Sequence, residues 1–535
     1  MEFKFGGSET NQKTVLGHPS GLFVLFFTEM WERFSYYGMR ALLVLFLTAS
    51  LLKEGWGWER DDALLLYGWY TGLVYLTPII GGFIADKLMG YRKAVVLGAF
   101  IMTAGHASMA LEGFSSYFFY LGLLCLIIGN GLFKPNVSSM VGQLYKDQGK
   151  EKDAGYTIFY MGINAGAFLG ILLCGYIGEK VGWHYGFGLA GIFMFLGMLQ
   201  FYFAQKIFGD IGLSPEQEKK LVETEFSDLD DKIAEPSKQV REAKAAKEVE
   251  DKIVVRDRIT VISIFALFTI FFWWAFEQAG GSMTIFAADY TDRALIGNAA
   301  TTFKIVNTII TVVPMLIISW VLLQLFRQTF GKFALSNVWL GLSFVIIWGI
   351  VLWMLKREFS ADATEVPASW FSVLNSLFII LFAPLFSKIW ESKFNPSGPI
   401  KFALGLVLLG VGFAILSYGA FTIPEGAKTA SVSLMFLVFA YLFHTLGELC
   451  VSPVGLSYVS KLAPVKLVGL MFGIWFVANF IANLLGGVTG SYIDTISEQY
   501  GLSAFFLMFT VIPFAAAFIL VLLNPMMKRK MHGIK

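Results

Sequence analysis

Long apolar segments alternate with short polar loops along the whole chain. Each segment has about 20 residues or more, the length that an α-helix needs to cross the hydrocarbon core of a bilayer. Such segments predict an all-α polytopic membrane protein, because a spanning helix satisfies its backbone hydrogen bonds internally. The fourteen expected segments are 21–47, 62–85, 93–112, 117–142, 155–179, 185–206, 259–288, 302–326, 333–355, 368–390, 401–421, 431–460, 466–492 and 502–526.

Basic residues in the loops predict the orientation. The loop after the second segment carries Lys87, Arg92 and Lys93, whereas 113–116 and 494–501 contain no Lys or Arg. Cytoplasmic loops are enriched in Lys and Arg, and an even number of segments places both termini on one side. We therefore expect a multi-pass protein of the cell membrane with both termini in the cytoplasm. Basic residues of the same parity are Lys146, Lys150, Lys152, Arg327, Lys332, Lys388, Lys393, Lys461, Lys466, Lys528, Arg529 and Lys530.

One long polar stretch, residues 209–258, divides the chain. Its section 240–255 is rich in Ala, Lys and Glu, which favour a helix. We interpret 207–258 as a cytoplasmic linker that follows an N-terminal six-helix bundle, residues 1–206. A regulatory or partner-binding role of the linker is the alternative.

Composition agrees with a membrane protein and argues against other classes. The 535 residues are 56% hydrophobic and 15% charged, against about 25% charged in a typical soluble domain. The small net charge of +2 by itself says nothing about nucleic acid, and we expect no nucleic-acid partner. Residues 1–20 are polar, and the first apolar segment is too long for a signal peptide. The cysteines Cys125, Cys174 and Cys450 lie in apolar segments and suggest no disulfide. Neither a metal-ligand cluster nor a nucleotide-binding loop is present, so the sequence predicts no enzyme, metal or cofactor.

Several charged residues lie inside the apolar segments. The first segment contains Glu29, Glu32, Arg33 and Arg40, which share one helical stripe with Tyr36. Each charge in lipid would cost roughly 2.5–3.5 kcal/mol. Such residues are expected to pair with one another around a wet cavity, which marks a transport route. Later segments add Lys134, Glu277 and Glu448.

Five sequence blocks resemble known transporters. Residues 82–93, GFIADKLMGYRK, resemble the loop signature of the major facilitator superfamily. Residues 29–34, EMWERF, resemble the E-x-x-E-R-F signature of the proton-dependent oligopeptide transporter (POT) family. The further matching blocks are GNGLFKPN at 129–136, FYMGINAG at 159–166 and GELCVSPVGL at 447–456.

The chain departs from that family between its seventh and eighth core helices. Residues 276–278 resemble the seventh helix and 370–375 the eighth, which a short loop normally joins. Here 294–365 intervene as an inserted hairpin, so the C-terminal bundle comprises 259–293 and 366–535. We expect the hairpin to serve peripheral packing, lipid contact or assembly, with a gating role as the alternative. Lys304 and Asn307, near its outer end, are its only candidate site residues.

The resemblance implies two six-helix bundles around a cavity that opens alternately to each side. It implies a symporter that imports di- and tripeptides together with protons, with lipids as its surroundings, and we expect a monomer. Glu29, Glu32 and Arg33 are the expected proton-coupling residues, and Arg40 with Glu277 the expected outer gate. The expected substrate-binding residues are Arg33, Tyr36, Tyr37, Tyr75, Lys134, Asn164, Asn375, Glu448 and Trp475.

The residue types suit a zwitterionic substrate. Arg33 and Lys134 offer a cationic pole for a peptide carboxylate. Glu448 offers an anionic pole for the ammonium group, and near-equal depth suits it to pair with Lys134 across the two halves. Asn164 and Asn375 are expected hydrogen-bonding partners, although ordinary interhelical bonds are the alternative. Tyr160 and the other aromatic residues could instead be packing residues.

Other functions stay open at this point. Relatives of the family carry nitrate or other small solutes, so another cargo is the first alternative. A peptide sensor that does not transport is a second one, although no appended signalling domain supports it. We expect His444 to be a packing residue.

Overall fold

The structure is a computed structural model that describes residues 4–145, 149–217, 219, 252–464 and 467–534. Most of the helix expected at 240–255 lies outside these residues, as do Lys146 and Lys466 of the basic loops.

Helices form at all fourteen predicted positions. The long helices are α1 (Ser20–Thr48), α2 (Arg60–Ile84), α3 (Tyr91–Met109), α4 (Ser116–Leu144), α5 (Gly149–Lys180), α6 (Trp183–Ala204), α9 (Lys252–Phe276), α11 (Gly297–Thr329), α12 (Ala334–Phe359), α13 (Val373–Glu391), α14 (Gly398–Ala420), α15 (Met435–Leu462), α16 (Val468–Ser491) and α18 (Leu502–Lys530). The shorter ones are η1 (Glu9–Gln12), η2 (Leu51–Lys53), η3 (Ala85–Met89), η4 (Gln205–Phe208), η5 (Glu277–Gly280), α10 (Ser282–Ile285), η6 (Phe286–Tyr290), η7 (Ala368–Ser372) and α17 (Ile493–Tyr500).

In the residues that the structure describes, six two-residue strands form three small ladders. The strands are β1 (Thr14–Val15), β2 (His18–Pro19), β3 (Thr291–Asp292), β4 (Ala294–Leu295), β5 (Thr364–Glu365) and β6 (Val432–Ser433). β1 pairs with β2 and β4 with β5, both antiparallel, whereas β3 pairs with β6 in parallel. The last two ladders tie distant loops together at one end of the helices.

Within the described part of the chain, twelve helices are long and apolar enough to cross a membrane. The other two long helices are α1, which carries four charged residues, and α3, which has 19 residues. Nearly all of α1 is buried, and Glu29, Glu32 and Arg33 are each at most 2% exposed. The charges of α1 therefore lie inside the protein and not against lipid.

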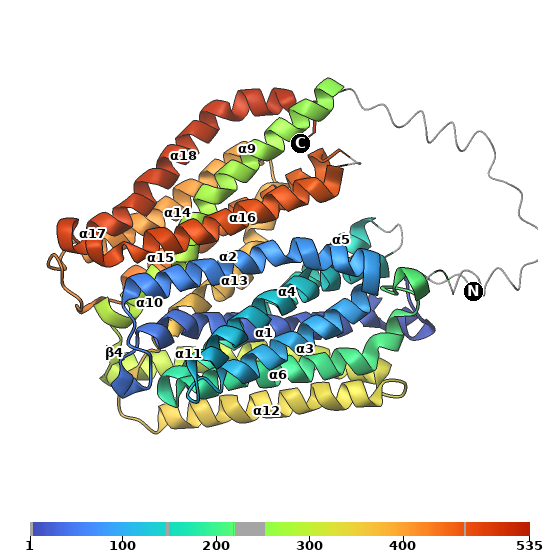
Figure 1. Cartoon of the computed structure of the whole chain (residues 1–535), viewed down its shortest axis with the longest axis horizontal. Helices are drawn as coiled ribbons and strands as arrows, with labels where there is room; N and C mark the ends of the chain where they lie inside the picture. Colours follow the sequence, from blue (N-terminus) through green and yellow to red (C-terminus); the bar gives the residue numbers. More distant parts are fainter. Residues whose placement is uncertain (1–3, 146–148, 218, 220–251, 465–466, 535) are drawn as a thin grey trace, which may run out of the picture.

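The core helices pack as two groups that face each other (Figure 1). Helices α1–α6 contact one another extensively, as do α9, α13–α16 and α18. The two groups meet chiefly where α2 packs on α16 and α5 on α13. Both termini lie at one end of the helices (Figure 1). We name this end, which contains Ser20 and Lys530, the terminal face, and the opposite end, which contains Arg60 and Tyr290, the distal face.

The inserted hairpin consists of α11 and α12 and lies where the sequence predicts it. It leaves the second group through β4 and returns through β5, and these two strands form its neck. Its helix α12 runs along α6 of the first group (Figure 1). The hairpin thus starts in one group of helices and packs on the other.

Candidate functional site

A cavity of about 1140 Å³ lies between the two groups of helices. Exposed Asp153 and Tyr156 line it near the terminal face, and Arg40 and Gly280 line it toward the distal face. The predicted site residues in its wall are Glu29, Arg33, Tyr37, Arg40, Tyr75, Lys134, Asn164, Asn375, Glu448 and Trp475. Side chains from both halves of the chain therefore meet around one space.

Charged residues of α1 form a compact cluster at the cavity. Arg33 Nε lies 3.1 Å from Glu29 Oε1 and also pairs with Glu32, one residue away. Asn130 of α4 donates from Nδ2 to Glu32 Oε1 at 2.9 Å. Glu32 is fully buried and does not line the cavity. One guanidinium thus serves two carboxylates, of which only Glu29 reaches the cavity wall.

Two polar atoms of this cluster have no hydrogen-bond partner among the described residues. They are Arg33 Nη2 and Glu29 Oε2, both buried. An unpaired buried polar group is costly. These atoms are therefore suited to receive a ligand or water from the cavity.

Lys134 of α4 lies against an aromatic wall. Its Nζ is 4.8 Å from the centre of the Tyr75 ring, which is a cation–π distance. No ion pair joins Lys134 to a carboxylate in the described part of the chain. The ammonium group therefore remains available to an anion in the cavity.

Glu448 of α15 forms the anionic side of the cavity. Its Oε2 accepts a hydrogen bond of 2.9 Å from Asn375 Nδ2, which also donates to Thr445 Oγ1 at 3.1 Å. The predicted direct pair between Glu448 and Lys134 is wrong for this conformation. The cavity separates the two halves here, so each residue binds a neighbour on its own side.

The other predicted residues occupy different positions. Tyr36 does not line the cavity: its ring lies 5.1 Å from the Tyr37 ring and 5.3 Å from the Arg33 guanidinium carbon. Asn164 lines the cavity but donates to the Tyr160 carbonyl oxygen within its own helix. Successive side chains of an α-helix point about 100° apart, so Tyr37 faces the cavity while its neighbour Tyr36 points away from it.

His444 also lines the cavity wall, one turn from Glu448. Its ring packs on Phe413 with centroids 4.4 Å apart, which fits the predicted packing role. Neither ring nitrogen has a partner among the described residues.

An ion pair between the two halves lies at the distal end of the cavity. Arg40 Nη2 of α1 contacts Oε2 of Glu277. Glu277 is the first residue of η5, which follows α9. Arg40 Nε also donates to Tyr67 Oη of α2 at 2.7 Å. The structure therefore brings together the two residues that the sequence predicts as a gate.

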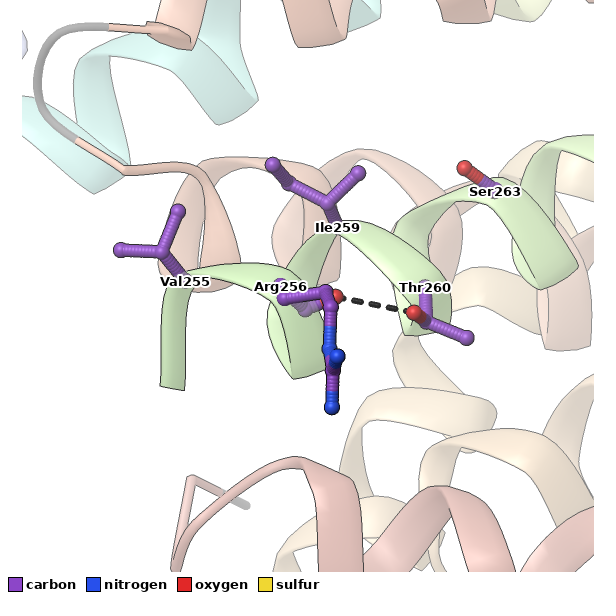
Figure 2. Close-up of a pocket in the computed structure, with 5 residues that line it drawn as sticks. All are labelled: Val255, Arg256, Ile259, Thr260 and Ser263. Atoms are coloured by element: carbon purple, nitrogen blue, oxygen red, sulfur yellow. Dashed lines mark hydrogen bonds between the residues drawn. The ribbon is translucent and has the colours of Figure 1, made fainter. Parts of the chain in front are cut away.

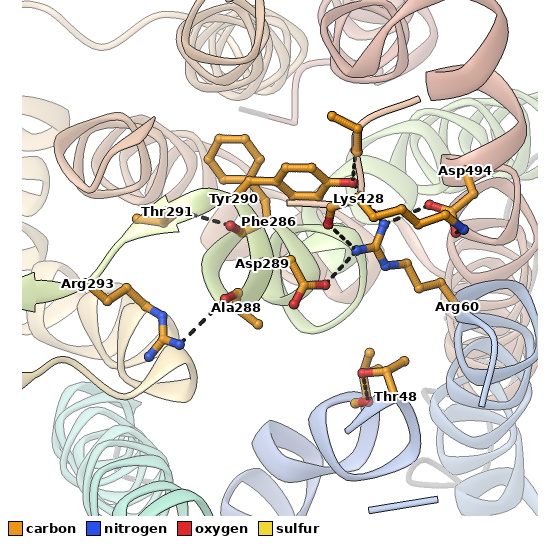
Figure 3. A network of polar contacts seen from close by, with 12 residues as sticks. Thr48, Arg60, Phe286, Ala288, Asp289, Tyr290, Thr291, Arg293, Lys428 and Asp494 are labelled. Atoms are coloured by element: carbon orange, nitrogen blue, oxygen red, sulfur yellow. Dashed lines mark hydrogen bonds and ion pairs between the residues drawn. The ribbon is translucent and has the colours of Figure 1, made fainter. Parts of the chain in front are cut away.

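A second network, the Arg60 network, lies farther toward the distal face and was missed from the sequence. Figure 3 shows Arg60 of α2 between Asp289 and Asp494, at 2.7 and 2.8 Å. Arg60 also donates to Tyr290 Oη and to the Lys428 carbonyl oxygen. Charged residues at the distal ends of segments in both halves were the signal. Such charges do not predict an ion-pair network from the sequence alone, because charged residues in loops are usually solvated.

Helix α5 makes a third contact between the halves. The Glu179 carboxylate accepts hydrogen bonds from the backbone of Ala368 and Ser369 at 2.8 and 2.9 Å, which caps the start of η7. Next to it, Lys180 and Arg293 both pair with Glu365 in the neck of the hairpin. Burial raises the pKa of Glu365, but the Lys180 hydrogen bond and the Arg293 charge outweigh it and lower the pKa.

A second hollow lies on the surface of α9 near the terminal face (Figure 2). A single helix face lines it, with Arg256 as its one charged residue, and Thr260 Oγ1 donates to the Arg256 carbonyl oxygen. It brings together no set of groups that could act on a ligand.

Comparison with known proteins identifies the family. The model described as the POT family matches residues 92–363 and 349–511. The chain belongs to the POT family. It is thus a polytopic transporter with the major facilitator fold, and the resemblance of its sequence blocks is confirmed.

Individual members of the family are similar over nearly their whole length. The uncharacterized transporter YclF of Bacillus subtilis (strain 168) is 34% identical and covers 98% of this chain and 97% of its own. A di-/tripeptide transporter of Lactococcus lactis subsp. cremoris is 32% identical over 88% of each chain. The crystal structure of a peptide transporter POT in complex with sulfate is 28% identical, with a TM-score of 0.71 and 97% of each chain covered.

Proposed function

We propose that this protein is a symporter that imports di- and tripeptides with protons across a bacterial inner membrane. The observation that carries the proposal is the cavity, in whose wall Lys134 on one half and Glu448 on the other have no ion pair among the described residues. Arg33 and Lys134 come from the first half and Glu448 from the second. The names of its relatives, a di-/tripeptide transporter among them, support the substrate class.

The two poles match the two ends of a short peptide. Every unmodified peptide has a carboxylate and an ammonium group, whatever its side chains. Arg33 Nη2 has no hydrogen-bond partner in the described structure, and Lys134 contacts a ring and not a carboxylate. Glu448 accepts from a neutral amide and not from a cation. Lys134 and Glu448 therefore each keep a charge that a zwitterion could neutralise, while Arg33, already paired with Glu29 and Glu32, offers a free N–H group.

Proton coupling follows from the shared guanidinium of Arg33. When a peptide carboxylate binds Arg33, Glu29 and Glu32 lose part of their ion pairing. A carboxylate that loses a cation in a buried site favours its protonated form. Peptide binding and proton uptake then support each other in the same conformation.

The termini orient this cycle. The basic loops support a cytoplasmic terminal face, by the positive-inside rule. The cavity extends toward that face, while Arg40, Glu277 and the Arg60 network lie between it and the distal face. The conformation described is therefore the one that releases substrate inward.

Uptake into proteoliposomes tests the proposal. Labelled dialanine should accumulate inside vesicles only when an inward proton gradient is imposed, and unlabelled peptides should compete with it. The variant Lys134→Ala should lose this uptake, whereas the variant Lys53→Ala, at an exposed lysine of η2, should retain it.

Two outcomes would contradict the proposal. Competition by nitrate and not by peptides would indicate a small anion as the cargo. Peptide binding without any accumulation or exchange would indicate a sensor.

A further inference from the structure

The inserted hairpin reaches the helix that carries the charge cluster. Phe344 of α12 is 5% exposed, and its ring lies 5.7 Å from both the Phe27 and the Trp31 ring of α1. Both contacts are edge-to-face, at 84° and 69°, a geometry that stabilises aromatic pairs. Trp31 lies in the sequence between Glu29 and Glu32.

A second route joins the hairpin to the same turn of α1. Ser336 of α12 donates to the Gln200 carbonyl oxygen of α6 at 2.7 Å. The Gln200 side chain in turn accepts from Thr28 Oγ1 at 2.9 Å and donates to the Val24 carbonyl oxygen. The residue contacted, Thr28, directly precedes Glu29.

The hairpin is attached to the first group of helices at both ends as well. On the terminal side, Lys332 pairs with Glu9 of the N-terminal segment. On the distal side, Tyr176 of α5 donates to Glu358 Oε1 at 2.7 Å, and Arg357 donates to the Lys180 carbonyl oxygen. The hairpin therefore contacts the first group along its whole length.

We propose that the inserted hairpin supports α1 from outside the bundle, and that Phe344 is a positioning residue for the cluster of Glu29, Glu32 and Arg33. The role in proton coupling rests on the function proposed above. Arg33 must alternate between two carboxylates and a ligand, and this exchange requires a fixed backbone beneath it. Phe344 and Phe193 hold Trp31 from two helices, the second by stacking at 4.8 Å. Phe344 touches neither the cavity nor the charges.

The variant Phe344→Ala tests this role in full-length protein in proteoliposomes. Proton-driven dialanine accumulation should fall at least tenfold, and the pH profile of dialanine exchange should shift. The KM for exchange should stay within about twofold, because the residues that bind the peptide are untouched. The conservative variant Phe344→Leu should recover most of the accumulation.

Val345→Ala is the matched control. Val345 is the next residue of α12, is 71% exposed, and should behave as the wild type. Equal accumulation by Phe344→Ala and Val345→Ala would overturn the proposal. So would a parallel loss of accumulation and exchange with an unchanged pH profile, because that pattern indicates only less folded protein.

Hydrogen exchange separates this inference from the proposed function. Amides of residues 24–34 should exchange faster in Phe344→Ala than in Val345→Ala. If the wild type shows no proton-driven uptake but this difference appears, the proposed function fails and the support of α1 stands. If the wild type transports and the difference is absent, the support of α1 fails.

Discussion

At the scale of single residues, the protein keeps charges inside its helices by sharing partners. Arg33 contacts both Glu29 and Glu32, and Asn130 occupies a further oxygen of Glu32. Removing one member of a buried ion pair typically costs about 3–5 kcal/mol, because the other charge is left unpaired. The charges of α1 are therefore expected to change partners together and not one at a time.

Glu32→Gln should separate transport from proton coupling. A glutamine still accepts from Asn130 and fills the same volume, but it carries no charge and cannot take up a proton. We expect proton-driven dialanine accumulation to disappear while some dialanine exchange remains. Accumulation at the wild-type rate would remove Glu32 from the coupling role, and Glu54→Gln, on an exposed loop, is the control.

A charge swap tests the contact between Arg40 and Glu277. Arg40→Glu or Glu277→Arg alone places two like charges together. The side chains of Arg40 and Glu277 are only 12% and 4% exposed, so solvent screens this repulsion little. Each single change should abolish uptake, and the double change should restore a measurable part of it. No recovery in the double variant, measured as dialanine uptake, would leave the pairing without support as a gate.

At the scale of helices, the closure of the distal face depends on backbone contact between the two halves. A Cβ on Gly68 of α2 would lie 2.6 Å from the Cα of Gly487 in α16, and one on Gly487 would lie 2.4 Å from the Cα of Gly68. Neither helix can accept a methyl group there unless the two halves separate. Two glycines thus allow the closest approach of α2 and α16.

Gly68→Ala should therefore favour conformations in which the distal face opens. We expect faster labelling of a cysteine at Thr284, in the cavity wall, by a membrane-impermeant reagent added from the distal side. The three native cysteines would be replaced in this background. Gly113→Ala, in a distal loop where a Cβ would meet nothing within 4 Å, should leave labelling unchanged. Identical labelling in both variants would show that the glycine contact does not limit opening.

The elements show what the sequence could and could not predict. Apolar length predicted all fourteen long helices, including α1, whose four charges would disqualify it on hydropathy alone. It also predicted the hairpin, but not that α12 would pack on α6, because an apolar helix surface does not specify its neighbour. Likewise, Glu448 was recognised from its block, whereas its partner in this conformation is Asn375. Pairing across the halves depends on which face is open, and one sequence encodes both states.

At the scale of the whole molecule, the energy of the proton gradient sets how well the distal face must stay closed during transport. About 100 mV of membrane potential contributes roughly 2.3 kcal/mol per proton, and one pH unit adds about 1.4 kcal/mol. For a neutral peptide carried with one proton, this supports accumulation of several hundred-fold. Such a gradient survives only if the distal face stays closed while the cavity is open at the terminal face.

The Arg60 network is the outermost part of that closure, and Arg60→Gln tests it. Arg60 joins α2 to Asp289 and to Asp494 of α17, so its loss removes the ion pair of Asp289 and leaves Asp494 with only the exposed Lys428 in the closed state. We expect the population with an open distal face to rise by roughly tenfold, because Asp289 and Asp494 are 36% and 24% exposed and their pairs contribute less than the roughly 3–5 kcal/mol of a buried pair. The readouts are faster labelling of Thr284→Cys from the distal side and weaker proton-driven accumulation of dialanine.

Lys428→Gln provides a control in the same network. Lys428 contacts Asp494 at 3.3 Å, but its side chain is 57% exposed, and an exposed pair contributes only about 0–1 kcal/mol. Its loss should therefore change labelling little. Adding Asp289→Asn to Arg60→Gln removes the carboxylate that has lost its ion pair. The double variant should therefore show a labelling rate at Thr284→Cys closer to that of the wild type. If Arg60→Gln and Lys428→Gln behave alike, the network is a surface ion pair, and closure must rest on Arg40, Glu277 and the contact of α2 with α16.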